Sequence, residues 1–211
     1  MLKRYFRKLL FSIVLIGVSQ ARAGSYEDFF VAVANDDAPT VQALLARGFD
    51  PNTVGPRGQV PLYAALQAGS LKVADALWQH PELQIDVANA NGETPLMMAA
   101  LRGQLAWCQR LVARGVPVDR GGWTPLHYAA SGPDPQVVGW LLDRGAKLEA
   151  RSPNGSTPLM MAAGYGSESS VEVLLARGAD PKLRNDPGLT AADFAQRAGR
   201  EALARRLSQP R

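Results

Sequence analysis

Few side chains in this sequence could carry out chemistry. There is one cysteine, Cys108, and the only histidines are His80 and His127. A general base at His127 could act with Ser131 or Asp134, but nothing in the sequence orients a second group onto it, and a catalytic triad needs all three roles filled. No glycine-rich phosphate loop, paired-carboxylate site or nucleophile motif accompanies it. The residues therefore predict that the chain is not an enzyme, and a hydrolase is the alternative that His127 leaves open.

Two methionine pairs could suggest a soft-metal or haem site. The pairs are Met97 with Met98 and Met160 with Met161. Successive residues of a helix point about 100° apart, so neither pair can chelate one ion. We expect the first methionine of each pair to face the packed interior and the second to face the surface. The histidines and the cysteine also lack metal-ligand spacing. The sequence thus predicts no cofactor and no metal, with a small-molecule or haem carrier as the second alternative.

A heptapeptide recurs along the chain. TPLMMAA begins at Thr94 and again at Thr157, and TPLHYAA begins at Thr124 between them. In chain order the first interval is 30 residues, and the next two are 33 residues each, the last of them ending at Thr190. A period near 33 indicates a repeat architecture. The predicted units are residues 27–59, 60–93, 94–123, 124–156, 157–189 and 190–211.

Two packing positions keep the same register in all the units. An alanine stands five residues after each opening position, at Ala32, Ala65, Ala99, Ala129, Ala162 and Ala195. A leucine stands seventeen residues after it, at Leu44, Leu77, Leu111, Leu141, Leu174 and Leu207. A small side chain lets neighbouring helices approach closely, and a large branched one fills the space between layers. Cys108 aligns with Val41, Val138 and Val171, which predicts a buried core thiol.

Each unit is predicted to form two short helices. Thr94, Thr124 and Thr157 suit the N-cap of the first helix, and a proline follows each of them at the first helical turn. Glycines suited to left-handed C-caps follow the second helix, at Gly48, Gly115, Gly145 and Gly178. The runs TPLHYAA, VEVLLARGADP and VQALLARGFDPN resemble the ankyrin repeat.

The resemblance covers residues 27 to about 208. It implies an all-α fold, an ankyrin-repeat solenoid of about six helix-turn-helix units with projecting turns. It also implies a concave face that binds other macromolecules, and a hydrogen-bonding role for His127 in the turn network. One unit departs from the pattern, because the exit from Gly115 to Thr124 is 9 residues, whereas the exit from Gly145 to Thr157 is 12. One projecting turn is therefore expected to be clipped, leaving a notch in the row.

The first 23 residues have the order of a secretory signal peptide. A basic segment precedes the apolar run LLFSIVLIGV, and Ala21 and Ala23 supply the small residues that a signal peptidase reads. The apolar run is too short to serve as a membrane anchor. We expect cleavage after Ala23, with the ankyrin repeat domain at residues 24–211 secreted into a bacterial periplasm.

Removal of the signal segment changes the charge balance. The whole chain has 23 basic and 19 acidic residues, and five of the basic residues lie in residues 1–23. The remaining 18 basic against 19 acidic residues give a net charge near −1, so nucleic acid is not an expected partner. A secreted chain with one cysteine forms no internal disulfide, so packing alone is expected to hold it.

Residues around the opening positions are expected to lie on the concave surface. Aromatic, methionine and arginine side chains dominate buried contacts between proteins, and here they recur across consecutive units. The predicted partner-binding residues are Arg57, Gln59, Glu93, Met98, Leu101, Arg102, Trp123, Tyr128, Met161 and Tyr165. We expect a non-enzymatic periplasmic module that binds another exported or envelope protein through this face. Its role would be that of an inhibitor or immunity protein, or of an accessory in stress defence.

Overall fold

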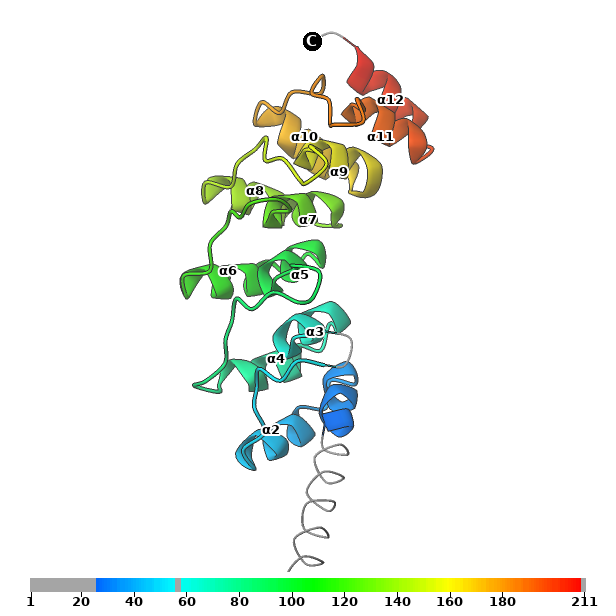
Figure 1. Cartoon of the computed structure of the whole chain (residues 1–211). Coiled ribbons are helices and arrows are strands. Elements are labelled where there is room, and N and C mark those ends of the chain that lie inside the picture. The colour runs from blue at the N-terminus through cyan, green and yellow to red at the C-terminus, as the bar shows by residue number, and fades with distance from the viewer. Residues whose placement is uncertain (1–25, 56–57, 210–211) are drawn as a thin grey trace, which may run out of the picture. The chain divides into compact units, whose positions relative to one another are not determined.

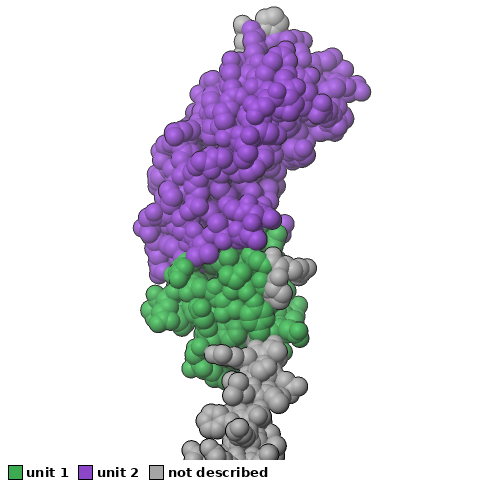
Figure 2. Space-filling model, viewed as in Figure 1, with its two compact units in different colours: residues 1–84 green, residues 85–211 purple. Residues whose placement is uncertain are grey.

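The computed structural model describes residues 26–55 and 58–209, and these residues form helices and turns without β-strands. They belong to two compact units, residues 1–84 and residues 85–211 (Figure 2). The predicted all-α fold is confirmed. The predicted signal peptide, residues 1–23, and Arg57 lie outside the described residues. Within the described ranges, no helix has both the length and the apolar character needed to span a bilayer.

The first unit is built from short helices around an aromatic and aliphatic core. Phe29 is fully buried and stacks on Phe49, with the ring centroids 4.4 Å apart. The last helix of the unit, α4, packs against both α2 and α3. The unit therefore has a core of its own. Its helices are residues 26–34, α2 (Ala38–Ala46), α3 (Pro61–Ala68) and α4 (Leu71–Trp78).

The second unit stacks helix pairs in the predicted layered order. Its first helices pack on one another in the order α5, α7, α9 and α11, and the second helices α6, α8 and α10 pack in a neighbouring column (Figure 1). The final helix, α12, packs on α11. The helices are α5 (Pro95–Leu101), α6 (Leu105–Ala113), α7 (Pro125–Ser131), α8 (Pro135–Asp143), α9 (Pro158–Tyr165), α10 (Glu168–Ala176), α11 (Ala191–Arg197) and α12 (Glu201–Ser208).

The residues in repeat register form the core, as predicted. The alanines with no exposed surface are Ala65, Ala99, Ala129, Ala162 and Ala195. The leucines with no exposed surface are Leu77, Leu111, Leu141 and Leu174. Small side chains between the first helices permit the close approach of one layer to the next. The repeated alanine and leucine thus set the spacing of the layers.

The first helices of the second unit begin at capped threonines. The side chains of Thr94, Thr124, Thr157 and Thr190 each accept a hydrogen bond from the backbone N–H of the third helical residue. That third residue accepts in return from the backbone N–H of the threonine. The acceptor is the Sδ of Met97 or Met160, at 3.4 Å, the Nδ1 of His127, at 3.2 Å, or the Oδ2 of Asp193, at 2.7 Å. A thioether sulfur therefore takes the place of an imidazole nitrogen in a shared capping role.

A five-residue turn projects ahead of several first helices. The N–H of its first residue donates to the C=O of its fifth, at 2.8–3.0 Å, in turns 89–93, 152–156 and 185–189, and the N–H of Gly55 donates to the C=O of Gln59 at 2.8 Å. Among the described residues, the segment before α7 has no such closing bond. Its Gly122 nevertheless keeps a positive φ of 78°, close to the 77° of Gly92 in turn 89–93. The predicted clipped turn is confirmed.

Candidate functional site

An apolar cavity lies against the first helices of the second unit. Its volume is about 240 Å³, and we call it the hollow. Three successive first helices, α5, α7 and α9, and the loop before α7 supply its lining residues. The lining residues are Leu101, Trp123, His127, Tyr128, Ser131 and Met161. Because most of them are aromatic or aliphatic, the hollow suits an apolar group.

An aromatic pair, Trp123 and Tyr128, forms one wall of the hollow. The Trp123 ring packs edge-on against Tyr128, with centroids 6.5 Å apart, and against His127, with centroids 5.3 Å apart. The Tyr128 hydroxyl donates a hydrogen bond to Oε1 of Glu93 at 2.9 Å. Burial of the phenol, assisted by this bond, raises the pKa of Tyr128, so the hydroxyl stays protonated. The wall is thus fixed in place before any partner arrives.

His127 is fully buried beside the hollow and has a structural role. Its Nδ1 accepts a hydrogen bond from the Thr124 backbone, so its Nε2 carries the proton and donates to the carbonyl oxygen of Ser156 at 2.9 Å. Burial lowers the pKa of His127, which keeps the ring neutral. This pair of bonds ties α7 to turn 152–156 of the following repeat, consistent with the role that the resemblance implied.

The two groups considered as partners of His127 in catalysis are engaged elsewhere. The hydroxyl of Ser131 donates to the backbone carbonyl of His127 at 2.9 Å, one turn earlier in α7. The carboxylate of Asp134 caps α8 by accepting from the backbone N–H of Gln136 at 2.9 Å. Within the described residues both side chains therefore serve helix ends rather than the imidazole.

Substitution of His127 by methionine is expected to flatten the acid dependence of stability. The folded state resists protonation of His127, whereas the unfolded state binds a proton near the ordinary pKa of 6.5. The contribution of His127 to stability is therefore complete above 6.5 and is lost as the pH falls below it. The loss is at most about 1.4 kcal/mol for each pH unit.

The measurement is urea unfolding of the wild type and of His127→Met between pH 7.5 and 5.5, values chosen to span roughly one unit on each side of the histidine pKa. Methionine is the matched replacement because Met97 and Met160 already fill the same capping position. The free energy of unfolding of the wild type should fall relative to that of the variant as the pH is lowered. A constant difference across this range would contradict the assignment of a neutral, buried imidazole.

The clipped turn opens a second cavity, which we call the notch. Its volume is about 450 Å³, and Trp123 and Tyr128 line it as they line the hollow. The flanking walls come from turn 89–93 and from Pro153 in turn 152–156. The lining residues are Asn91, Gly92, Met97, Arg120, Gly121, Gly122, Trp123, Tyr128 and Pro153. The hollow and the notch therefore share the aromatic pair as a common border.

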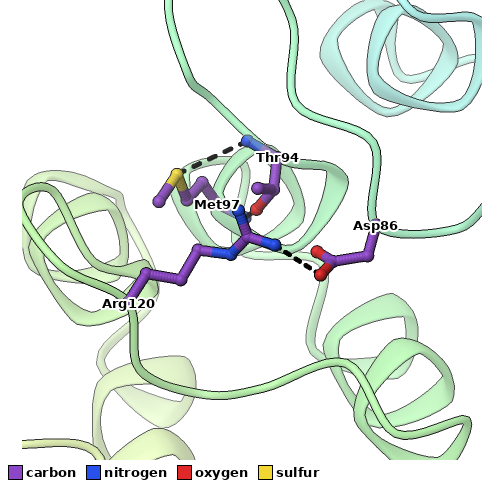
Figure 3. A network of polar contacts seen from close by, with 4 residues as sticks. All are labelled: Asp86, Thr94, Met97 and Arg120. Atoms are coloured by element: carbon purple, nitrogen blue, oxygen red, sulfur yellow. Dashed lines mark hydrogen bonds and ion pairs between the residues drawn. The ribbon is translucent and has the colours of Figure 1, made fainter.

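Arg120 anchors the clipped segment in the notch. Its guanidinium forms an ion pair with Asp86, while the Met97 sulfur lies beside the Thr94 backbone nitrogen (Figure 3). The two charged side chains are 32% and 30% exposed, so water screens their attraction only in part. Arg120 and Asp86 thereby neutralise each other. The Arg120 side chain therefore holds the clipped segment to the preceding segment, whereas the longer turns are closed by their own backbone hydrogen bonds.

The structure brings only part of the predicted binding strip together. Leu101, Trp123, Tyr128 and Met161 line the hollow, and Glu93 is bonded to its wall. Arg102 and Tyr165 are exposed but do not line it, and the Tyr165 side chain keeps 68% of its surface. Gln59 is half-buried and belongs to the first unit.

The expected exposure of Met98 is wrong. The side chain is only 3% exposed, whereas Met161 at the equivalent position of α9 is half-buried. Met98 therefore belongs to the packed core of α5 and not to a binding surface. Met97 and Met160, which were expected to face the interior, are buried at 2% and 1% exposure.

Cys108 is a core side chain, as its alignment with valines predicted. It is a free cysteine with no exposed surface in α6. Burial raises its pKa to about 12, so the thiol stays protonated at neutral pH. Packing in the core is therefore sufficient to explain a cysteine at position 108, and no reactive role is needed.

Sequence reasoning missed the residues that line the notch beyond the aromatic pair. Asn91, Arg120 and Pro153 carry no motif of their own. The signal that could have found them is the three-residue deficit between Gly115 and Thr124, because a missing turn leaves its neighbours' side chains uncovered. The three-residue deficit predicted the position of the notch but did not identify the residues that line it.

Comparison with protein families gives a consistent result along the chain. The family model described as "Ankyrin repeats (3 copies)" matches residues 29–120, 82–152, 108–185 and 134–210. Together these overlapping matches span both units. They agree with the period near 33 and with the helix pairs described above.

Two curated proteins illustrate the similarity in sequence. Mouse (Mus musculus) ankyrin repeat and SAM domain-containing protein 6 is 30% identical over 109 residues, which is 50% of this chain and 12% of that protein. Palmitoyltransferase AKR1 of Lachancea kluyveri is 27% identical over 121 residues, 54% of this chain and 16% of that protein. The chain therefore spans less than a fifth of the length of either relative.

One solved structure resembles the chain over most of its length. It is described as the predatory endopeptidase Bd0816 from Bdellovibrio bacteriovorus in complex with immunity protein Bd3460. The matched chain superposes with a TM-score of 0.71 and 26% sequence identity. The match covers 87% of this chain and 98% of that chain.

Proposed function

The chain belongs to the ankyrin repeat family, and from that premise we propose that it is a non-enzymatic module that binds an exported protein through the hollow. Ankyrin repeats mediate binding between proteins. The observation that carries the proposal is the hollow itself, where apolar side chains of three successive repeats meet around one cavity. An aromatic, aliphatic or methionine side chain of the partner would fill it.

The chemistry of the hollow supports a contact that contributes strongly to affinity. Trp123 and Tyr128 are of the types that most often dominate binding free energy, and a pocket at the centre of an interface excludes water best. The wall is already fixed by the bond from Tyr128 to Glu93, so little side-chain entropy remains to be lost on binding. Apolar surface buried there contributes roughly 25 cal/mol for each Å² removed from water.

We further propose that the partner is an exported enzyme of the peptidase class and that binding inhibits it. The basic, apolar and small-residue order of residues 1–23 supports export to the periplasm. Similarity to a chain from a complex between an endopeptidase and an immunity protein supports the inhibitory role. That similarity extends over nearly the whole of the matched chain, so the proposal rests on the full array and not on one repeat.

Affinity capture from a periplasmic extract tests the proposal. The bait is the full chain, expressed with its N-terminal segment, purified from the periplasm through a C-terminal tag and immobilised. The wild type should retain an exported protein that the double variant Trp123→Ala/Tyr128→Ala fails to retain. Loss of two aromatic anchors is expected to weaken binding by at least about thirtyfold. Addition of the wild type should also slow peptide cleavage by the captured protein.

Two further variants keep the test decisive. Trp140→Ala removes a half-buried tryptophan from α8, outside the hollow, and should leave capture unchanged. Met161→Glu places a charge in the hollow and should abolish capture even if the double variant proves unstable. Helical content is compared by circular dichroism for each variant. Equal capture by the wild type, the double variant and Met161→Glu would refute the hollow as the site.

A further inference from the structure

We infer that the notch binds an extended backbone segment of the partner protein, which takes the place of the missing projecting turn. The inference rests on the proposed function, since it describes how a protein partner is held. The hollow would receive a side chain of the partner, and the notch its main chain. The two cavities lie on either side of Trp123 and Tyr128, so one partner loop can occupy both.

An intact pair of turns shows which bond is missing. In the unclipped part of the second unit, the backbone N–H of Asp186 donates to the carbonyl oxygen of Asn154 at 3.0 Å. This bond joins turn 185–189 to turn 152–156. Asn91 stands three residues before Thr94, as Asn154 stands three residues before Thr157. The carbonyl of Asn91 is therefore the equivalent acceptor in the turn that precedes the clipped segment.

Backbone groups around the notch lack this pairing. Within residues 26–55 and 58–209, no hydrogen bond is formed by the Asn91 carbonyl or by the N–H groups of Gly121, Gly122 and Trp123. Pro153, which lines the notch from turn 152–156, cannot supply a donor, because proline has no backbone N–H. The residues that carry these donors and this acceptor line the same cavity. An extended segment that offers its own C=O and N–H groups would satisfy both.

Charge and size favour a neutral peptide segment over an anion or a small metabolite. Arg120 is the cation that lines the notch, and Asp86 already neutralises it. The volume of about 450 Å³ holds a few residues, and an extended chain advances about 3.3 Å per residue. Unpaired backbone groups recognise main chain in the same way that an open sheet edge does. The two glycines leave the approach to that backbone free of side chains.

Restoring the missing turn tests the inference. In the test variant, Gly121 is replaced by the four residues Ala-Asn-Asp-Pro, which together with Gly122 reproduce the run Asn185–Gly188 and supply an N–H at the position of Asp186. The exit from Gly115 to the following threonine then has the same 12 residues as the exit from Gly145. Gly122 already has the positive φ that this turn needs. The control is Gly139→Ala in α8, outside the notch, where an added Cβ meets only the Val173 side chain at 4.0 Å.

Two probes are used: the purified protein identified by capture, and linear heptapeptides selected from a random phage-displayed library on the wild type. The turn-restored variant should bind both at least about thirtyfold more weakly, since two or more hydrogen bonds are lost, while Gly139→Ala binds as the wild type does. Bound probe should also slow amide hydrogen exchange at Gly121, Gly122 and Trp123. Helical content and the urea midpoint should not fall in the turn-restored variant.

The outcomes separate the two proposals. Undiminished binding of the captured protein to the turn-restored variant, together with loss in Trp123→Ala/Tyr128→Ala, would overturn the notch and leave the hollow standing. Unchanged exchange at the three amides in the complex would also overturn it. Heptapeptides that bind the turn-restored variant as tightly as the wild type would do the same. If neither set of variants affected capture, the proposed function itself would fail.

Discussion

Gly166→Ala is expected to lower the free energy of unfolding by at least about 3 kcal/mol. Gly166 is the C-cap of α9, with φ −88° and ψ −175°, a conformation open to any residue. The substitution is destabilising for steric reasons, because a Cβ at this position would lie 1.9 Å from the carbonyl oxygen of Ala130 in α7. Since that oxygen belongs to backbone, the two layers must move apart. Urea unfolding followed by circular dichroism measures the loss.

Gly139→Ala is the matched control for this substitution. Gly139 lies inside α8, and the nearest neighbour of a methyl group added there would be the Val173 side chain, at 4.0 Å. Replacement of an interior helical glycine by alanine reduces the entropy of the unfolded chain, so a gain of about 0.5–1 kcal/mol is expected. The same chemical change should thus have opposite signs at two glycines of adjacent repeats. An equal change in the free energy of unfolding at the two positions would show that the layers do not depend on the Gly166 contact.

Regular features of this fold could be read from the sequence because each depends on local spacing. Ala129 and Leu141 lie in the core because the register repeats in every unit. Equivalent positions of stacked repeats have similar packing environments, so they take similar residues. The three-residue deficit before Thr124 predicted a clipped turn because a shorter loop cannot close the same hydrogen-bonded ring. The length of this connection was sufficient to predict the position of the clipped turn.

Features that depend on contacts between repeats were not accessible in this way. Met98 is buried whereas Met161 at the equivalent position is half-buried, a difference that the helical period does not specify. The ion pair of Arg120 with Asp86 joins residues 34 positions apart. The capping role of Met97 was hidden because thioether sulfur is a weak acceptor, and it works here only because the Thr94 N–H has no helical partner.

Four of the six residues that line the hollow were therefore predictable from their residue types, but the way in which they form its walls was not. Trp123 and Tyr128 stood out as aromatic residues at surface positions of one repeat. Their orientation depends on the bond from Tyr128 to Glu93, which lies in the preceding turn, and on the edge-on contact of Trp123 with His127. These contacts determine that the pair borders two cavities. Tyr165 carries the same signal in sequence and lies outside both.

Arg200→Ala is expected to lower the free energy of unfolding by about 2–3 kcal/mol, since hydrogen bonds from a charged donor are stronger than neutral ones. Nη1 of Arg200, which precedes α12, lies 3.0, 3.0 and 2.9 Å from the carbonyl oxygens of Ala162, Ala163 and Gly166. These oxygens are at the C-terminal end of α9, where the helix dipole is negative, and the Ala162 oxygen also accepts from the Gly166 N–H at 3.0 Å. The Arg200 guanidinium therefore donates hydrogen bonds to these carbonyls and also places a positive charge at the negative end of the helix dipole.

Arg206→Ala is the control for this loss. Arg206 pairs with Glu172 at 2.6 Å, but the two side chains are 47% and 56% exposed. A solvent-exposed pair contributes at most about 1 kcal/mol, so its removal should shift the urea midpoint little. Salt sharpens the contrast, because screening at high ionic strength weakens the exposed pair far more than the half-buried contacts of Arg200. Equal losses for the two arginines would mean that the last repeat is held by its net charge and not by the carbonyls of α9.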